Sequence, residues 1–254
     1  MAIEVLSSEV IDQIAAGEVV ERPAHLVKEL VENSIDAGAT RIQVEFDFGG
    51  RFVKISDNGC GMSQEDLSKC LGRHATSKIR AASDLWGLKS FGFRGEALSS
   101  ISAVSRTTLI SRQPGSETAF KLVSEFGAKS TIDAVGGGVG TTIVVEDLFA
   151  NLPVRLKFLK SETAEHTQIK LTLKSLALAN PEIEFRVSSK GKLLNLWTKT
   201  ENRLARAKQI FENQDLYFCS HEREGFKVEG VFSSPSQVTQ TSRSLYVFVQ
   251  NRVV

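Results

Sequence analysis

An amphipathic helix followed at once by two short strands is the feature that most limits how this chain can fold. Proline suits the first position of a helix and glycine the residue after its end, so the apolar repeat bounded by Pro23 and Gly38 predicts a helix from Pro23 to about Ala37. Residues 41–46 and 53–55 then alternate polar and apolar side chains around Gly49-Gly50, which predicts a β-hairpin. The chain therefore mixes helices and strands from its start.

The rest of the chain continues this mixture. Further helices are expected at about residues 8–16, 63–71 (with Ser63 as N-cap and Asp66 as capping-box acid), 96–103, 161–179 and 201–211. Further strands are expected at about residues 107–112, 119–125, 141–146, 183–187, 193–197, 226–232 and 245–249. Residues 72–95 show little apolar periodicity, which predicts a long loop of the kind that often covers a site.

A domain boundary is expected near residues 200–203. We therefore predict one domain over residues 1–202 and an incomplete second domain over residues 203–254. Because the chain stops inside an expected strand, we expect it to be a fragment of a longer protein.

Charge and composition exclude several function classes. The 31 Lys and Arg residues nearly balance the 30 Asp and Glu residues, and a net charge of +1 argues against a strongly basic nucleic-acid binder. Arg155, Lys157 and Lys160 either form a local DNA-binding patch or lie on a solvated stretch. No signal peptide and no run of about 20 apolar residues is present, so we expect a soluble, cytoplasmic protein without membrane contact.

The cysteines and histidines do not predict a zinc site. The three cysteines show no C-x-x-C spacing and the four histidines are scattered, so we expect reduced thiols.

The helix that begins at Pro23 carries a group of polar residues along one edge. Glu29, Asn33 and Asp36 are spaced by four, three and seven residues, which puts them on one side of the helix. An Asn oxygen can bind a hard cation and a Glu carboxylate can take a proton from water. Lys28 and Glu32 are expected to face water. The expected buried arc consists of Leu26, Val27, Leu30, Val31, Ser34 and Ile35. An ordinary polar helix edge is the alternative.

Two glycine-containing loops add binding groups. Asp57-x-Gly59-x-Gly61 follows a strand, and its carboxylate can accept a hydrogen bond from an exocyclic amine such as that of adenine. A plain turn is the alternative. Residues 92–98 lead from glycine into a helix start, where free backbone N–H groups can bind phosphate, although the loop is not a Walker A motif. Thr76, Ser77 and Lys78 add hydroxyls and a cation, and a flexible loop before a capped helix is the alternative.

A third glycine-rich segment precedes a strand. Gly136-Gly137-Gly138 does not read as a dinucleotide-binding loop, because the expected strand at residues 141–146 follows it where a helix would be needed. Thr142, in Gly140-x-Thr142, could support Asp57 and an adenine base.

In this order the motifs resemble those of the GHKL ATPases, which include type II topoisomerases, heat-shock chaperones, sensor histidine kinases and MutL. Longer strings resemble the MutL family specifically. They are I-D-Q-I-A-A-G-E-V-V-E-R-P at residues 11–23, K-E-L-V-E-N-S-I-D-A-G-A at 28–39, R-H-A-T-S-K-I at 73–79, G-F-R-G-E-A-L-S at 92–99 and F-A-N-L-P-V-R-L-K-F-L at 149–159. The likeness is clear to about residue 200 and looser beyond.

The resemblance implies an α+β Bergerat fold, in which a mixed, mainly antiparallel sheet carries helices on one face. It also implies a partial second domain similar to domain 2 of ribosomal protein S5. Glu29 would be the general base, Asn33 would hold Mg²⁺ on the ATP phosphates, and Asp57 would bind adenine. The other ATP-binding residues would be Gly61, Met62, Thr76, Ser77, Lys78, Gly92, Phe93, Arg94, Gly95, Glu96, Ala97, Leu98 and Thr142.

The MutL resemblance further implies slow ATP hydrolysis that drives homodimerisation and switches partners during DNA mismatch repair. The implied partners are a MutS-type mismatch recognition protein, a downstream nuclease or helicase, and weakly bound DNA, with nucleoid or nuclear association. A non-catalytic ATP-binding repair adaptor and a chaperone-type ATPase are the alternatives.

Two departures from the MutL pattern bear on these expectations. The family's second-domain lysine that reaches the γ-phosphate would lie beyond Val254, so turnover should be impaired. The chain has Val249-Gln250-Asn251-Arg252 where members often have V-N-G-R. Because Asn tolerates a positive φ, we expect that turn to survive.

Overall fold

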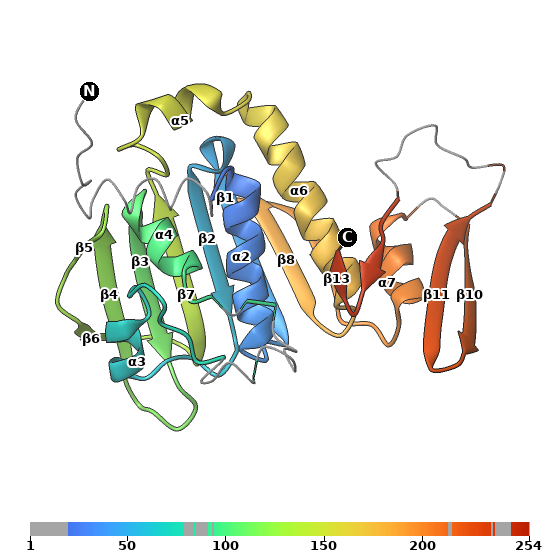
Figure 1. The fold of residues 1–254 in the computed structure, drawn as a ribbon, viewed down its shortest axis with the longest axis horizontal. Helices are drawn as coiled ribbons and strands as arrows, with labels where there is room; N and C mark the ends of the chain where they lie inside the picture. Colours follow the sequence, from blue (N-terminus) through green and yellow to red (C-terminus); the bar gives the residue numbers. More distant parts are fainter. Residues whose placement is uncertain are drawn as a thin grey trace, which may run out of the picture.

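The protein is built around one large twisted sheet with helices on one side. The computed structural model describes residues 20–78, 84, 91–92, 94–212, 215–234, 236 and 245–253. The sheet has nine strands in the order β5-β4-β3-β7-β2-β1-β8-β9, with β6 paired to β4 (Figure 1). Its strands are β1 (Arg41–Asp47), β2 (Phe52–Asp57), β3 (Arg106–Arg112), β4 (Ala119–Glu125), β5 (Ala128–Lys129), β6 (Asp133–Val135), β7 (Gly140–Glu146), β8 (Glu184–Ser189) and β9 (Lys192–Trp197).

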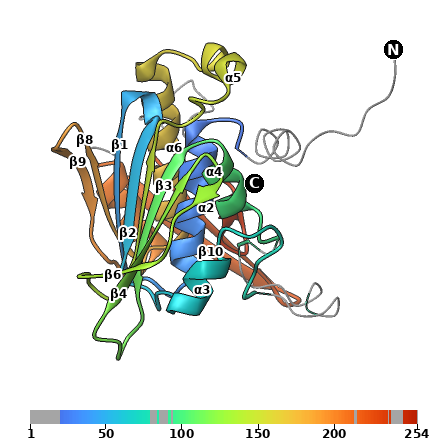
Figure 2. The ribbon, with the colours of Figure 1, turned by 90° about the vertical axis from the view of Figure 1, so that its left-hand side faces the viewer.

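Within the described strands, β1 and β8 form the only parallel pair, and the other pairs are antiparallel. The helices are α2 (Pro23–Asp36), α3 (Gln64–Lys69), α4 (Ala97–Ala103), α5 (Pro153–Phe158), α6 (Glu162–Ala179) and α7 (Arg203–Ile210), with a 3-10 turn, η1 (Phe48–Gly50). Figure 2 shows the strands of the large sheet on the left and α2, α3 and α4 to their right, on the same side of the sheet. The predicted α+β class and mainly antiparallel sheet are confirmed.

The helix that begins at Pro23 forms as predicted and packs on the sheet. Leu26, Val27, Leu30 and Val31 of α2 are at most 1% exposed. They share one core with the inward side chains of β1 and β2. In β1, buried and outward residues alternate as the sequence pattern predicts. The shared core therefore fixes α2 over the centre of the sheet, where β2 and β1 lie side by side (Figure 1).

Local capping signals are also confirmed. Ser63 caps α3, and Asp66 completes a capping box with it.

The turn between β12 (Phe248–Val249) and β13 (Arg252–Val253) forms without glycine, because Gln250 and Asn251 adopt φ of 50° and 65°. Gly136 to Gly138 precede β7 and not a helix, as expected.

Some elements differ from the prediction. The chain forms α5 and an antiparallel ribbon of β10 (Leu216–Arg223) with β11 (Phe226–Ser233), of which only β11 is predicted. Seven of the eight residues of β10 are exposed, so pairing and not burial of one face holds this strand. The strand expected at residues 245–249 is shorter, since only residues 248–249 pair. The helix expected at residues 8–16 lies outside the described residues.

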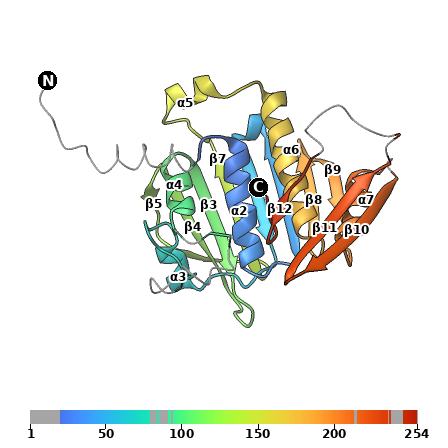
Figure 3. The ribbon, with the colours of Figure 1, turned by 45° about the vertical axis from the view of Figure 1, so that its right-hand side comes forward.

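Helix α7 joins the ribbon to the sheet. Figure 3 shows the β10–β11 ribbon beside α7. Helix α7 also contacts α6. The Arg206 side chain of α7 is fully buried and donates to the carbonyl oxygens of Ile183 at 2.6 Å and Pro181 at 2.8 Å. Burial lowers the pKa of Arg206 to about 10. In the described part of the chain, no helix combines the length and apolar character needed to cross a bilayer.

Candidate functional site

The polar edge of α2 gathers a lysine from a distant loop. Lys78 donates through Nζ to Asn33 Oδ1 at 2.9 Å and to Asp36 Oδ2 at 2.5 Å. The Asp36 side chain is 8% exposed, so this ion pair is largely shielded from water. Glu29 lies one turn before Asn33 and is half-buried. Asn33 and Asp36 therefore share Lys78 as a partner, and the Asn33 oxygen is already bound to a cationic group.

The expectation that Glu32 faces water is wrong. Its side chain is only 12% exposed. Burial raises the pKa of Glu32 to about 7, because it disfavours the charged carboxylate. Lys28 and Arg252 oppose this rise, and Glu29 and Asp36 add to it. The helical pattern alone cannot show that Arg252, from the β12–β13 hairpin, lies near this face of α2.

A second polar cluster surrounds Asp57 at the end of β2. Its Oδ1 accepts hydrogen bonds from the backbone N–H groups of Gly59 at 2.9 Å and Thr141 at 3.2 Å. Its Oδ2 accepts one from Ser34 Oγ at 2.9 Å. Burial raises the pKa of Asp57, and these three hydrogen bonds partly offset that rise. The carboxylate is therefore fixed in one orientation by α2, its own loop and β7.

Ser34 is the residue that the sequence reasoning missed. It was assigned to the buried apolar arc of α2, and it is indeed only 4% exposed. Its hydroxyl, however, points to Asp57 across 23 residues of sequence. A polar residue on an otherwise apolar helix face is the signal that could have identified this contact, since buried hydroxyl groups need partners.

The loop after Asp57 approaches β3 closely. Gly61 adopts a φ of 62°, and a β-carbon there would collide with the carbonyl group of Arg112. Met62 donates through its backbone N–H to Ser111 Oγ at 2.8 Å, and its side chain packs against the core. Gly61 and Met62 are thus held beside the Asp57 cluster.

Thr142 lies opposite Ser56 in the β2–β7 pairing, and its hydroxyl donates to Ser56 Oγ at 3.0 Å. Its hydroxyl was expected to support Asp57, but the neighbouring Thr141 makes the contact with that carboxylate through its backbone. Thr142 is paired with Ser56, so its side chain shares a face of the sheet with Ser56. Asp57 is the next residue of β2, and its side chain therefore points to the opposite face.

The two predicted phosphate-binding segments touch each other. Gly95 has a φ of 64°, and a β-carbon on it would lie 2.5 Å from the Ala75 carbonyl oxygen. Thr76 Oγ1 accepts the backbone N–H of Lys78 at 3.1 Å, and Gly92 donates to Asp36 Oδ2 at 3.3 Å.

The remaining predicted residues of these segments are more peripheral. Ser77 and Arg94 are exposed. The Glu96 carboxylate lies 3.3 Å from His74 Nδ1. Ala97 is the first residue of α4, and Leu98 packs against the core. Phe93 lies outside the described residues.

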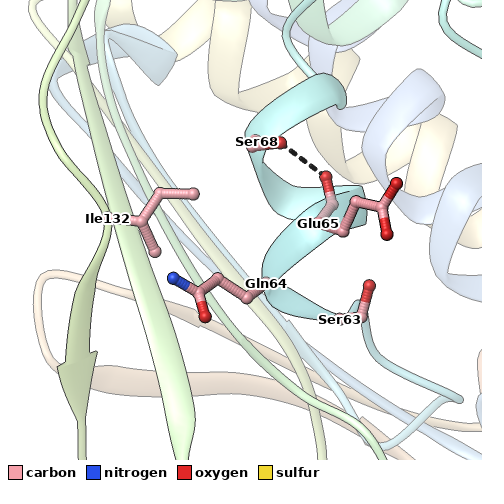
Figure 4. A pocket seen from close by; sticks show the side chains of 5 residues that line it. All are labelled: Ser63, Gln64, Glu65, Ser68 and Ile132. Carbon is pink, nitrogen blue, oxygen red and sulfur yellow. Dashed lines mark hydrogen bonds between the residues drawn. The ribbon is translucent and has the colours of Figure 1, made fainter.

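A recess elsewhere on the surface is separate from these clusters. Figure 4 shows it between α3 and Ile132, next to β6. It is lined by Ser63, Gln64, Glu65, Ser68 and Ile132. None of these residues belongs to the predicted site.

The arrangement places two kinds of binding group on neighbouring residues of one helix. Ser34 donates to the Asp57 carboxylate, which is a suitable acceptor for an amine. Asn33 binds Lys78, and Asp36 binds the backbone N–H of Gly92. An amide oxygen that already binds an ammonium group is chemically suited to a hard cation such as Mg²⁺. No group of three or more His, Cys, Asp or Glu side chains placed to hold a metal occurs among the described residues.

Comparison with known proteins agrees with this arrangement. Residues 21–135 match the model of the histidine kinase-, DNA gyrase B- and HSP90-like ATPases. The chain is 44% identical to the DNA mismatch repair protein MutL of Shewanella woodyi and 43% identical to that of Syntrophotalea carbinolica. These matches cover 100% and 99% of the chain but only 43% and 41% of the relatives, so the chain spans less than half of their length.

A solved structure extends the likeness to the fold. The Aquifex aeolicus MutL ATPase domain complexed with ADP superposes with a TM-score of 0.75 at 33% identity. The match covers 93% of this chain and 84% of that domain. Because both sequence and fold agree over most of a MutL ATPase domain, the chain belongs to the MutL family of DNA mismatch repair proteins.

Proposed function

We propose that this chain binds ATP with Mg²⁺ and hydrolyses it. The observation that carries the proposal is that two neighbouring residues of α2 each take part in one binding group. Ser34 donates to Asp57, an acceptor for an adenine amine, and Asn33 binds Lys78, which supplies a cation for phosphate. The Aquifex aeolicus MutL ATPase domain is complexed with ADP, which supports a nucleotide site of this kind.

In the proposed reaction, water attacks the γ-phosphorus and the bond to the β–γ bridging oxygen breaks, giving ADP and phosphate. Glu29 takes the proton of the attacking water. Asn33 would hold Mg²⁺, which would supply positive charge against the phosphates. Asp57 accepts a hydrogen bond from the adenine amino group and so orients the nucleotide, with Gly61 and Met62 near the base. Lys78 and residues 92–98 donate to the phosphates.

The cellular role we propose is a nucleotide-controlled switch in DNA mismatch repair. ATP would favour a homodimeric state, and hydrolysis would reset it, so that mismatch recognition by a MutS-type protein is coupled to strand removal by a nuclease or helicase. Such a switch requires ATP to bind one state more tightly than the other. We further propose that residues 203–254 belong to a second domain. DNA contact would be weak.

Isothermal titration with a non-hydrolysable ATP analogue and Mg²⁺ tests the binding site. We expect the wild-type chain to bind and Asn33→Ala to bind at least about tenfold more weakly, since it removes the cation ligand. Asn195→Ala on the distant strand β9 serves as the matched control and should bind like wild type. Binding that is equal in all three proteins would contradict the role of Asn33, and the absence of wild-type binding would overturn the ATP site.

Phosphate release from the Glu29→Ala variant separates an ATPase from a non-catalytic adaptor. We expect hydrolysis to fall by about 100-fold or more while binding of the analogue is retained, because a general base acts only in the chemical step. Glu65→Ala on the exposed face of α3 is the control. Unchanged hydrolysis in Glu29→Ala would exclude Glu29 as the base.

A further inference from the structure

We propose that Asp36 is a positioning residue that fixes the phosphate-binding groups of this site. The proposal rests on the ATP-binding function proposed above. The Asp36 carboxylate accepts three hydrogen bonds from two segments that lie far from it in sequence. Its Oδ1 accepts the backbone N–H of Phe91 at 3.0 Å. Its Oδ2 accepts the backbone N–H of Gly92 at 3.3 Å and the ammonium group of Lys78 at 2.5 Å.

These contacts bring two segments that are separate in the sequence, Lys78 and Phe91-Gly92, to one point on α2. The same lysine also reaches Asn33 Oδ1 at 2.9 Å. A β-carbon on Gly92 would lie 3.2 Å from Lys78 Nζ, so the backbone at this position lies directly against the ammonium group. The Asp36 side chain is 8% exposed, which keeps the cluster largely dry.

The chemistry of the cluster indicates what it prepares. Two backbone N–H groups and an ammonium group are the donors that proteins commonly direct at phosphate oxygens. Asp36 carries a negative charge, so it would repel a phosphate and cannot be its ligand. Its contribution is to hold the donors beside Asn33 before the nucleotide arrives, which reduces the entropy lost when the nucleotide binds.

Asp36→Asn tests this role because it keeps the shape of the side chain and an acceptor oxygen but removes the charge. We expect its affinity for a non-hydrolysable ATP analogue with Mg²⁺ to fall about tenfold, as for the loss of one charge-assisted hydrogen bond. Its affinity for adenosine, measured by NMR titration, should stay within about twofold of wild type. A purely structural role would lower both affinities.

A double-mutant cycle with Lys78→Met tests whether Asp36 acts through the lysine. If it does, the double variant should bind the ATP analogue no more weakly than Lys78→Met alone. Asp133→Asn, at an exposed position on β6, is the control for removal of one negative charge. Thermal unfolding without nucleotide shows whether each variant is folded. If Asp36→Asn does not fold, the affinity of Lys78→Met for the ATP analogue becomes the test. An affinity of Lys78→Met equal to that of the wild-type chain would then overturn the proposal.

Three other outcomes would overturn the proposal. They are unchanged affinity of Asp36→Asn for the analogue, tighter binding because the carboxylate competes with phosphate, and fully additive losses in the double variant. In each case the wild-type chain still binds the analogue, so the ATP site stands. Failure of the wild-type chain to bind would overturn the proposed function itself.

Discussion

At the scale of single residues, Ser34 shows how the proposed binding site extends into a helix face that packs against the core. The serine occupies a position in the apolar arc of α2, where its hydroxyl reaches both Leu30 O at 3.2 Å and Asp57 Oδ2 at 2.9 Å. Helical periodicity predicts that position 34 is buried, but its partner depends on how β2 is placed under the helix. The positions of Glu29, Asn33 and Asp36 along one edge of α2 were therefore predictable, whereas the contact between Ser34 and Asp57 was not.

Ser34→Ala should weaken nucleotide binding more than it weakens the fold. Without the hydroxyl, Asp57 loses one of the bonds that fix its carboxylate, so we expect about tenfold weaker binding of an ATP analogue by titration calorimetry. Ser102→Ala is a matched control, because Ser102 is a buried helical serine whose hydroxyl donates within its own helix, to Ser99 O. Equal nucleotide affinity in the two variants would show that Ser34 does not act through Asp57.

At the scale of elements, the ends of β2 and β7 determine the shape of the site. Ser56 faces Thr142 in this pairing, and β7 begins at Gly140 with a φ of 112°. A β-carbon at position 140 would fall on the carbonyl oxygen of Asp57. The glycine therefore allows β7 to approach closely enough for the Thr141 N–H to reach the Asp57 carboxylate.

Gly140→Ala should destabilise the protein by about 3 kcal/mol or more, because it adds both a steric clash and backbone strain. Gly115→Ala is the matched control, since Gly115 also has a positive φ, of 82°, but nothing lies within 4 Å of its β-carbon position. It should cost only about 1–2 kcal/mol, from strain alone. Urea denaturation measures both. Equal losses would mean that β7 can move away from Asp57 without cost.

At the scale of the whole molecule, one arginine links the sheet to the segment beyond it. Arg206 on α7 is fully buried and donates to the carbonyl groups of Pro181 and Ile183, just before β8. Its guanidinium carbon lies 5.9 Å from the Phe185 ring centroid. The sequence predicted α7 as a helix near a boundary. It could not predict this anchoring, because an arginine in a polar helix normally faces water.

Arg206→Ala should destabilise the protein by about 2–4 kcal/mol, because the carbonyl groups of Pro181, Ile183 and Trp197 would lose a charged donor and a cavity would form. Hydrogen exchange should show lost protection in α7 before β1 and β2 are affected. Arg223→Ala, whose side chain is 78% exposed, should change stability little. If α7 keeps its protection in Arg206→Ala, then apolar packing alone holds it.

Sequence patterns predicted the elements that carry local signals, such as the capped helices and the hairpin of β1 and β2. They did not predict β10, whose residues are mostly exposed, or the order of strands in the sheet, which depends on contacts between distant segments. The MutL resemblance supplied the architecture that local periodicity could not.

The parallel pairing of β1 with β8 has a consequence for biosynthesis. β2 can pair with one edge of β1 soon after both are translated, but the other edge must wait until β8 leaves the ribosome, after α6 has been made. During that interval the nascent chain exposes an unpaired strand edge, which is a template for aggregation. Translation speed and chaperone access between these two strands should therefore influence the yield of folded protein.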